Sequence, residues 1–138
     1  MTTSVLVTGA AGYLGGLLIR SLAEDPGGLT TIIGTDIRVP EYLPGNVTFV
    51  ESDVRDAGLV DVLAEYEIDV MVHLAAIVSP GKKPDRELEY SIDVGGTANV
   101  LDACLATGVS KVIVSSSGAS YGYHADNPDW IDEEDDLR

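Results

Sequence analysis

The chain has 138 residues, the size of one ordinary domain, and its 45% of apolar residues is too high for a disordered chain. The formal net charge of −15 makes nucleic acid and anionic membrane surfaces poor partners, because both carry negative charge. A single cysteine, Cys104, excludes an intramolecular disulfide and a multi-cysteine metal site. No basic residue precedes the first apolar run, and the most apolar stretch, residues 70–78, is too short to span a bilayer. We therefore expect a soluble cytoplasmic domain without a metal.

Short β-branched runs alternate with longer helical patterns, which is typical of a parallel sheet with crossover helices. In chain order, the pattern predicts a strand over residues 4–8, a helix over 13–24, strands over 30–35 and 47–50, a helix over 57–66, a strand over 69–73, a long helix over 84–107 and a strand over 111–115. Asp56 is expected to cap the second helix, and Gly108 to end the third. His73 and Cys104 fall in apolar runs, where we expect both side chains to pack in the core.

The turn after the first predicted strand contains three glycines at regular spacing, Gly9, Gly12 and Gly15. Gly9 allows a sharp turn off the strand, Gly12 lets the backbone approach a diphosphate, and Gly15 lets the helix pack close to the sheet. The amide groups at the helix start, where Tyr13 and Leu14 stand, then hold the phosphates with the help of the helix dipole. This strand–glycine–helix unit predicts a doubly wound α/β sheet, the Rossmann fold, that binds a dinucleotide.

Asp36 closes the second predicted strand, 21 residues after Gly15. A carboxylate at this place can accept hydrogen bonds from the adenosine ribose, and the alternative is an ordinary turn residue at a strand end. The negative charge also repels the additional phosphate of NADP, so we expect NAD as the cofactor and NADP as the less favoured one. Arg38, two residues further on, weakens that preference.

Four further motifs follow in order: Asp53-Val54-Arg55, His73-Leu74-Ala75-Ala76, Asp93-Val94-Gly95-Gly96-Thr97, and Ser115-Ser116-Ser117 leading to Tyr121-Gly122. Together with the glycine loop, they resemble the extended short-chain dehydrogenase/reductase family. Within it, the chain is most similar to the NAD-dependent nucleotide-sugar epimerases and dehydratases of the UDP-glucose 4-epimerase type. The resemblance runs from Val5 to about Gly122. It departs from the family at Asp93, where the family usually has Asn, which donates hydrogen bonds as well as accepting them.

The resemblance implies roles for particular residues. Ser117 would hold the substrate hydroxyl and is the one catalytic residue expected in this chain. Cofactor contacts are implied for Gly9, Gly12, Tyr13, Leu14, Gly15, Asp36, Ile37, Asp53, Val54, Leu74, Ala75, Ala76, Asp93 and Ser115. Structural alternatives stay open, because Asp53 can shape a turn and Ala75 and Ala76 can serve close helix packing.

The base in the family is a Tyr-x-x-x-Lys pair, and none of the six tyrosines here has a lysine four residues later. The resemblance therefore implies an N-terminal portion of an enzyme, with a dinucleotide-binding domain over residues 1–122 and an acidic loop over 123–138 that leads to the missing pair. We expect no catalytic activity from this polypeptide alone and a homodimer for the full-length protein. The strand over 111–115 would be an uncovered sheet edge, and the resemblance implies that the long helix over 84–107 would lack the neighbour it packs with in family dimers. We therefore also expect self-association or poor stability.

Two other functions stay open on the sequence. One is an extended short-chain dehydrogenase that acts on a hydroxysteroid or another small alcohol, since the His-x-Ala-Ala motif fits that branch as well. The other is a dinucleotide-binding sensor or scaffold without catalysis, because a fold does not fix a function.

Overall fold

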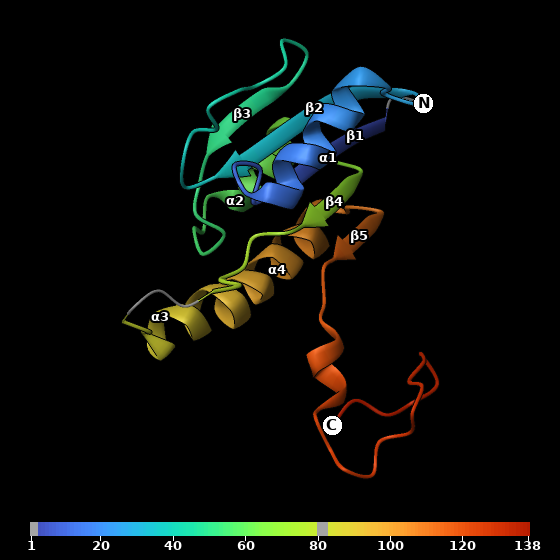
Figure 1. Ribbon diagram of the computed structural model, residues 1–138. Coiled ribbons are helices and arrows are strands. Elements are labelled where there is room, and N and C mark those ends of the chain that lie inside the picture. The colour runs from blue at the N-terminus through green and yellow to red at the C-terminus, as the bar shows by residue number, and fades with distance from the viewer. Residues whose placement is uncertain (1–2, 80–82) are drawn as a thin grey trace.

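The computed structural model describes residues 3–79 and 83–138 and centres on a five-stranded parallel sheet (Figure 1). The strand order is β3-β2-β1-β4-β5, the order of a doubly wound sheet. The strands are β1 (Thr3–Thr8), β2 (Leu29–Asp36), β3 (Thr48–Glu51), β4 (Val70–His73) and β5 (Lys111–Val114). The predicted fold class is confirmed, and no strand boundary lies more than one residue from its prediction.

Helices cover both faces of the sheet (Figure 1). Helix α1 (Tyr13–Glu24) packs on one face, and α2 (Leu59–Glu65) and α4 (Thr97–Thr107) pack together on the other. The central strand β1 supplies side chains to both layers: Leu6 packs with α2 and α4, Val7 packs with α1, and both are fully buried. Strands covered on both faces read as continuous apolar runs, which is why the sequence predicts them well.

The long helix predicted over residues 84–107 is one helical run with a wider turn inside it. Helix α3 (Arg86–Tyr90) begins after Asp85, whose carboxylate accepts a 3.0 Å hydrogen bond from the Leu88 amide. The run continues as a π-helical segment, η1 (Ser91–Gly96), and then as α4. A Cβ on Gly96 would lie 2.5 Å from the Val54 side chain, so a glycine is needed where η1 packs against the turn after β3. Such π-helical turns are frequent at functional sites.

The predicted cap of the second helix is wrong. Helix α2 begins at Leu59, its N-cap is Gly58, and no side chain caps it. Asp56 takes part through its backbone instead: its amide donates to the Asp53 carbonyl at 2.9 Å, and its carbonyl accepts from Leu59 at 3.1 Å. Hydrogen-bonded turns therefore occupy the residues between Asp53 and Leu59, and the helix starts two residues later than predicted.

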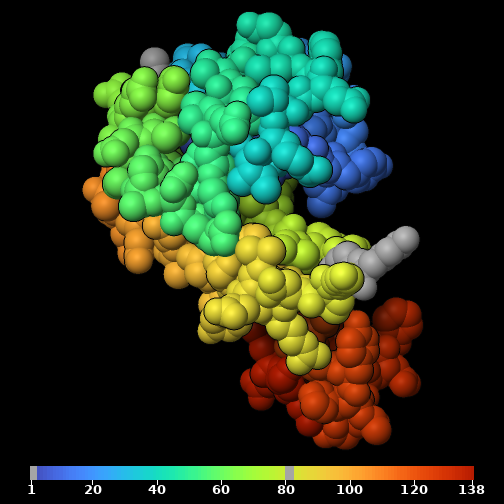
Figure 2. Space-filling model, turned by 90° about the vertical axis from the view of Figure 1, so that its left-hand side faces the viewer, coloured from blue at the N-terminus to red at the C-terminus, as the bar shows by residue number. Residues whose placement is uncertain are grey.

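Strand β5 is one of the two edge strands, and two of its apolar side chains are half-exposed, Ile113 at 49% and Val114 at 45%. The chain then forms a short 3-10 helix, η2 (Gly118–Tyr121), and an irregular segment to Arg138. Figure 2 shows this C-terminal segment, in orange to red, below the yellow segment and away from the blue-to-green N-terminal part of the chain. Among residues 3–79 and 83–138, no helix combines the length and the apolar character needed to cross a bilayer.

Candidate cofactor-binding site

The glycine loop leaves β1 through a turn that requires Gly9. This residue has φ +72°, and a Cβ on it would lie 2.9 Å from backbone atoms of Leu74 and Ala75. The loop closes through a 2.9 Å hydrogen bond from the Gly12 amide to the Gly9 carbonyl. Gly12 is the N-cap of α1, and no side chain caps this helix. The first-turn amides of α1 are therefore available to an anion.

Gly15 is required for a different reason from the one predicted. A Cβ on it would lie 2.1 Å from the Gly9 carbonyl oxygen and 3.0 Å from the Ala10 Cα. Its close contact is thus with the backbone of the glycine loop itself and not with the body of the sheet. Gly15 lets the first turn of α1 close against the loop, which fixes the positions of the amides there.

Asp36 lies beside the glycine loop. One carboxylate oxygen accepts the Ala11 amide at 3.1 Å, and the other accepts the Arg38 amide at 3.1 Å. These two bonds orient the carboxylate, and each oxygen keeps a further acceptor site for a hydroxyl donor. Asp36 therefore stabilises the turn at the end of β2, which was the structural alternative to ribose binding. Its carboxylate also faces the glycine loop that would hold a diphosphate.

A groove of about 430 Å³ runs along the carboxyl ends of β1, β2, β3 and β4. Nine of the predicted cofactor residues line it, namely Gly9, Gly12, Asp36, Ile37, Asp53, Val54, Leu74, Ala75 and Ala76. In open α/β sheets, ligands bind at this edge, where the strand order reverses. The sheet therefore gathers into one groove residues that are scattered over 68 positions of the sequence, from Gly9 to Ala76.

The other predicted site residues lie outside the lining of this groove. Tyr13 and Leu14 stand at the start of α1 with side chains that are 82% and 60% exposed. The Ser115 amide donates to the His73 carbonyl at 3.2 Å, just beyond β5. Ser117 caps η2 by accepting the Ala119 amide at 3.1 Å. Ser117 and Tyr121 both line a separate shallow depression near the C-terminal segment. Their proposed roles stay predictions.

Asp53 is held by an ion pair with Arg55, with 2.6 Å between the closest oxygen and nitrogen. The hydrogen bonds from the Arg55 guanidinium lower the pKa of Asp53, against the smaller opposing effect of burial. Arg55 also donates to the Ser91 hydroxyl at 3.1 Å. It thereby joins the turn after β3 to η1, so that the ionised Asp53 stays fixed in the wall of the groove.

Asp93 lies in η1 and contacts the segment that follows β4. Its carboxylate accepts the Ile77 amide at 2.9 Å. An asparagine oxygen could accept the same bond, so the departure from the family at this position keeps the acceptor and removes only a donor.

Several residues of the site carry no motif that identifies them in the sequence. Asn99 in α4 donates to the backbone carbonyls of Val54 at 2.7 Å and Asp56 at 2.9 Å, and so fixes the turn after β3. Ile77 and Ile92 line the groove. The one available signal for Asn99 is a polar residue next to the buried face of a helix, which is also common on exposed helices. His73 and Cys104 are both 3% exposed, as predicted for core side chains.

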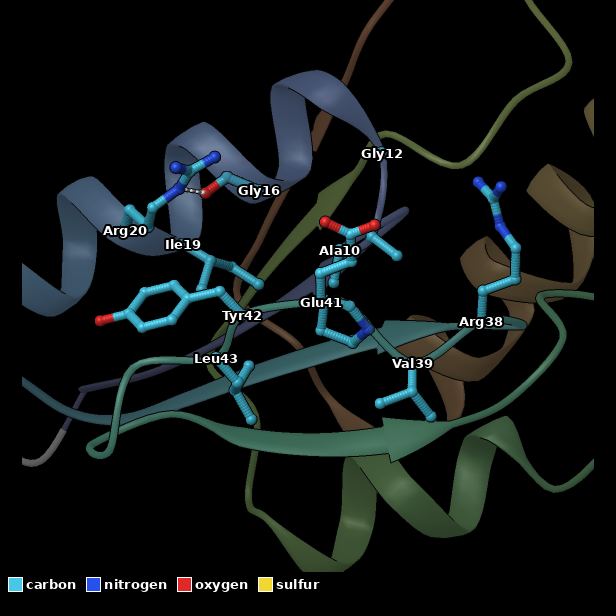
Figure 3. Close-up of a pocket in the computed structure, with 12 residues that line it drawn as sticks. Ala10, Gly12, Gly16, Ile19, Arg20, Arg38, Val39, Glu41, Tyr42 and Leu43 are labelled. Carbon is cyan, nitrogen blue, oxygen red and sulfur yellow. Dashed lines mark hydrogen bonds between the residues drawn. The ribbon is translucent and has the colours of Figure 1, made fainter.

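A second cavity, of about 500 Å³, lies on the α1 side of the glycine loop (Figure 3). Ala10, Gly12 and Gly16 line it together with Tyr42 and the other residues of the 38–43 segment. Figure 3 shows Arg20 bonded to the Gly16 carbonyl, at 3.0 Å, and Arg38 projecting away from Arg20 at the opposite end. Neither Asp36 nor Asp53 lines this cavity, so the predicted cofactor residues gather in the other groove.

The residues of the groove fit a dinucleotide. A Cβ would fill the space at Gly9, and the uncapped α1 amides suit a diphosphate. Thr35 lines the groove and is 1% exposed, and its hydroxyl is the one buried side-chain polar atom in the described part of the chain that lacks a partner. Across residues 3–79 and 83–138, no cluster of three His, Cys, Asp or Glu side chains is placed to hold a metal.

The fold and the groove define a dinucleotide-binding domain of the Rossmann type. The sequence matches the model of the NAD dependent epimerase/dehydratase family over residues 5–138, and the chain belongs to that family.

Relatives of known function agree with the family. A UDP-glucose 4-epimerase of Mycolicibacterium smegmatis is 36% identical over 124 residues, which cover 85% of this chain and 40% of the relative. A crystal structure of a UDP-glucose 4-epimerase superposes with a TM-score of 0.82 at 28% identity, covering 99% of this chain and 41% of that one. MoeE5, in complex with UDP-glucuronic acid and NAD, gives a TM-score of 0.76 at 34% identity, covering 97% and 42%. The chain thus spans about two fifths of the length of these proteins.

Proposed function

We propose that the chain is the NAD-binding portion of a nucleotide-sugar epimerase or dehydratase. The observation that carries this proposal is the groove in which the glycine loop, Asp36 and Asp53 meet at the carboxyl edge of the sheet. Family membership supports the cofactor, and the relatives named UDP-glucose 4-epimerase support the substrate class. The UDP-glucuronic acid and NAD in the MoeE5 complex support both.

The residues of the groove have distinct binding roles in this proposal. The amides of Tyr13 and Leu14 hold the diphosphate at the start of α1. Asp36 accepts the ribose hydroxyls, and its charge disfavours the additional phosphate of NADP. Asp53 and Val54 contact the adenine, while Ala75 and Ala76 leave room beside β4 for the nicotinamide half.

The chemistry of the proposed enzyme is reversible hydride transfer, in which bound NAD takes a hydride from a substrate carbon and returns it. This chain contributes orientation to that reaction. Ser117 accepts the Ala119 amide, which fixes its hydroxyl, and its own hydrogen can be donated to a substrate oxygen. Asp93 and Ser115 belong to the same proposed site.

We further propose that residues 1–122 form the dinucleotide-binding domain and that residues 123–138 lead to the Tyr-x-x-x-Lys pair, the catalytic base of the family. A cytoplasmic location stays a prediction.

A calorimetric titration of the 138-residue polypeptide tests this function. We expect NAD to bind and to raise the melting temperature, because binding to the folded state alone stabilises it, and we expect NADP to bind more weakly. The same polypeptide should not turn over UDP-glucose or reduce NAD in its presence. No heat and no change in melting temperature with NAD would refute the cofactor site, while turnover by this polypeptide would refute the proposed place of the base.

We propose a homodimer for the full-length protein, with an exposed apolar stripe of the long helical run as the contact surface. The stripe consists of Tyr90, Val94, Leu101 and Leu105, which recur at helical spacing and are between 40% and 82% exposed. Exposed apolar stripes of this kind mark association surfaces.

Replacing Leu105 with Glu should lower the self-association that we expect of the 138-residue polypeptide. The new charge would have to be buried in any contact that covers the stripe, at a cost of a few kcal/mol. Sedimentation velocity over a concentration series measures the change. Leu17→Glu is the matched control, because Leu17 is 44% exposed on α1, on the opposite face of the sheet. An equal loss of association in both variants, or a monomeric parent polypeptide, would contradict this surface.

A further inference from the structure

A chain of three hydrogen-bonded polar side chains, two of them buried and one half-buried, lies beneath the groove. Thr8 on β1 and His73 on β4 are register partners in the sheet, and they are 0% and 3% exposed. The Thr8 hydroxyl lies 2.8 Å from Nδ1 of His73, and Nε2 of His73 lies 3.0 Å from the hydroxyl of Thr97 on α4. The chain thus crosses from the central strand of the sheet to the helix layer.

The hydrogen bonds of Thr8 fix the direction of this chain. Its oxygen accepts the amides of Leu74, at 3.1 Å, and Ala75, at 3.2 Å. A hydroxyl oxygen has two lone pairs, so both are used, and the single hydroxyl hydrogen is left to donate to His73. Nδ1 of His73 is therefore an acceptor and carries no hydrogen.

The same reasoning continues on the other side of the ring. A neutral histidine without a hydrogen on Nδ1 carries it on Nε2, which then donates to Thr97. The Thr97 hydroxyl donates in turn to the backbone carbonyl of Asp93 at 2.6 Å. One arrangement of hydrogens satisfies every group, and it requires the neutral ring.

We propose that Thr8, His73 and Thr97 are positioning residues that hold segment 74–77 in its cofactor-binding shape, and that they do so only while His73 is neutral. Thr8 holds the first two amides of this segment, and the Asp93 carboxylate holds the Ile77 amide at 2.9 Å. Ala75, whose amide is one of these held groups, and Ala76, which lies between the two ties, both line the groove. The consequence for NAD affinity rests on the proposed function, whereas the hydrogen-bond chain itself does not.

Protonation of His73 would break the chain at Thr8. A hydrogen on Nδ1 would need an acceptor on an oxygen whose lone pairs are already used by Leu74 and Ala75. Burial lowers the pKa of His73, and the nearby Asp93 carboxylate opposes this in part, so the neutral ring is favoured at neutral pH. Because the folded-state pKa lies below the unfolded value of about 6.5, the stabilisation is complete above that pH and is lost as the pH falls below it.

Nitrogen NMR of the ¹⁵N-histidine-labelled polypeptide tests the arrangement of hydrogens without any substitution. At about pH 7.5, we expect His73 to show the Nε2–H tautomer alone, since only this tautomer fits its two partners. The chain has two histidines, and the exposed His124 serves as the internal reference. A protonated Nδ1, or a mixture of tautomers like that of an exposed ring, would overturn the proposal.

Amide hydrogen exchange tests the coupling. Thr97→Val should speed exchange at Leu74 and Ala75 about tenfold relative to the Ala10 amide, although both amides donate to Thr8 and not to Thr97. Thr97→Ser, which keeps the hydroxyl, should restore protection. Unchanged protection in Thr97→Val, or equally faster exchange throughout the chain, would overturn the proposal. If Thr97→Val unfolds, the tautomer measurement alone decides.

In the parent polypeptide, NAD affinity should fall in step with His73 protonation. A chain with the expected tautomer and coupling that binds no NAD would refute the proposed function only.

Discussion

Replacing Gly15 with Ala is expected to destabilise the chain by about 2–3 kcal/mol and to abolish measurable NAD binding. The added Cβ would lie 2.1 Å from the Gly9 carbonyl oxygen, which is backbone and unable to move alone. Either α1 shifts along its axis or the glycine loop opens, and both displace the amides that are proposed to hold the diphosphate. Urea denaturation and calorimetric titration with NAD measure the two effects.

The neighbouring glycine provides a matched control with the opposite expected sign. A Cβ on Gly16 would lie 3.6 Å from the Ala10 carbonyl oxygen, which is an ordinary contact. Alanine is favoured over glycine inside a helix by about 1 kcal/mol, so Gly16→Ala should stabilise the chain and leave NAD binding intact. If the two variants have the same stability, the tight closure of the loop against α1 is not a feature of the folded protein.

The contrast between Gly15 and Gly16 shows what the sequence predicts and what it leaves open. The spacing of the glycines predicts that position 15 needs a glycine, because the strand–loop–helix unit recurs in dinucleotide-binding proteins. The atom that enforces this need is a carbonyl six residues earlier, in the loop itself. The local sequence pattern thus identifies position 15 as a glycine position. The contact that requires the glycine depends on how tightly the glycine loop closes against α1, which the pattern does not give.

The same division applies to the rest of the site. Gly9 and Asp36 stand at strand ends, and parallel strands in a doubly wound sheet bring these ends to one edge, so their meeting is predictable. Thr8 and His73 are 65 positions apart, and their contact depends on the register of β1 with β4, which periodicity does not fix. The π-helical turn is hidden for a similar reason. Gly96, the last residue of this turn, packs against Val54 in the turn after β3, a contact that no local pattern reveals.

Replacing Asp36 with Ala should weaken NAD binding by about 30-fold, because hydrogen bonds to a charged group contribute about 1.5–3 kcal/mol. The preference for NAD over NADP should narrow at the same time, since the charge that repels the additional phosphate is lost and Arg38 remains. Calorimetric titrations with both cofactors measure both effects.

Two companion variants separate the role of the Asp36 carboxylate in the ligand site from its role in the fold. Asp36 accepts the Ala11 and Arg38 amides, so Asp36→Ala should also cost about 1 kcal/mol of stability. Asp36→Asn keeps one acceptor oxygen and should recover part of both losses. Glu51, the register partner of Asp36 on β3, is exposed and does not line the groove, so Glu51→Gln removes a charge from the same sheet edge without touching the site. We expect it to bind NAD like the parent polypeptide. Equal NAD affinity in Asp36→Ala and Glu51→Gln would mean that the Asp36 carboxylate only stabilises the glycine loop, and that other groups bind the ribose.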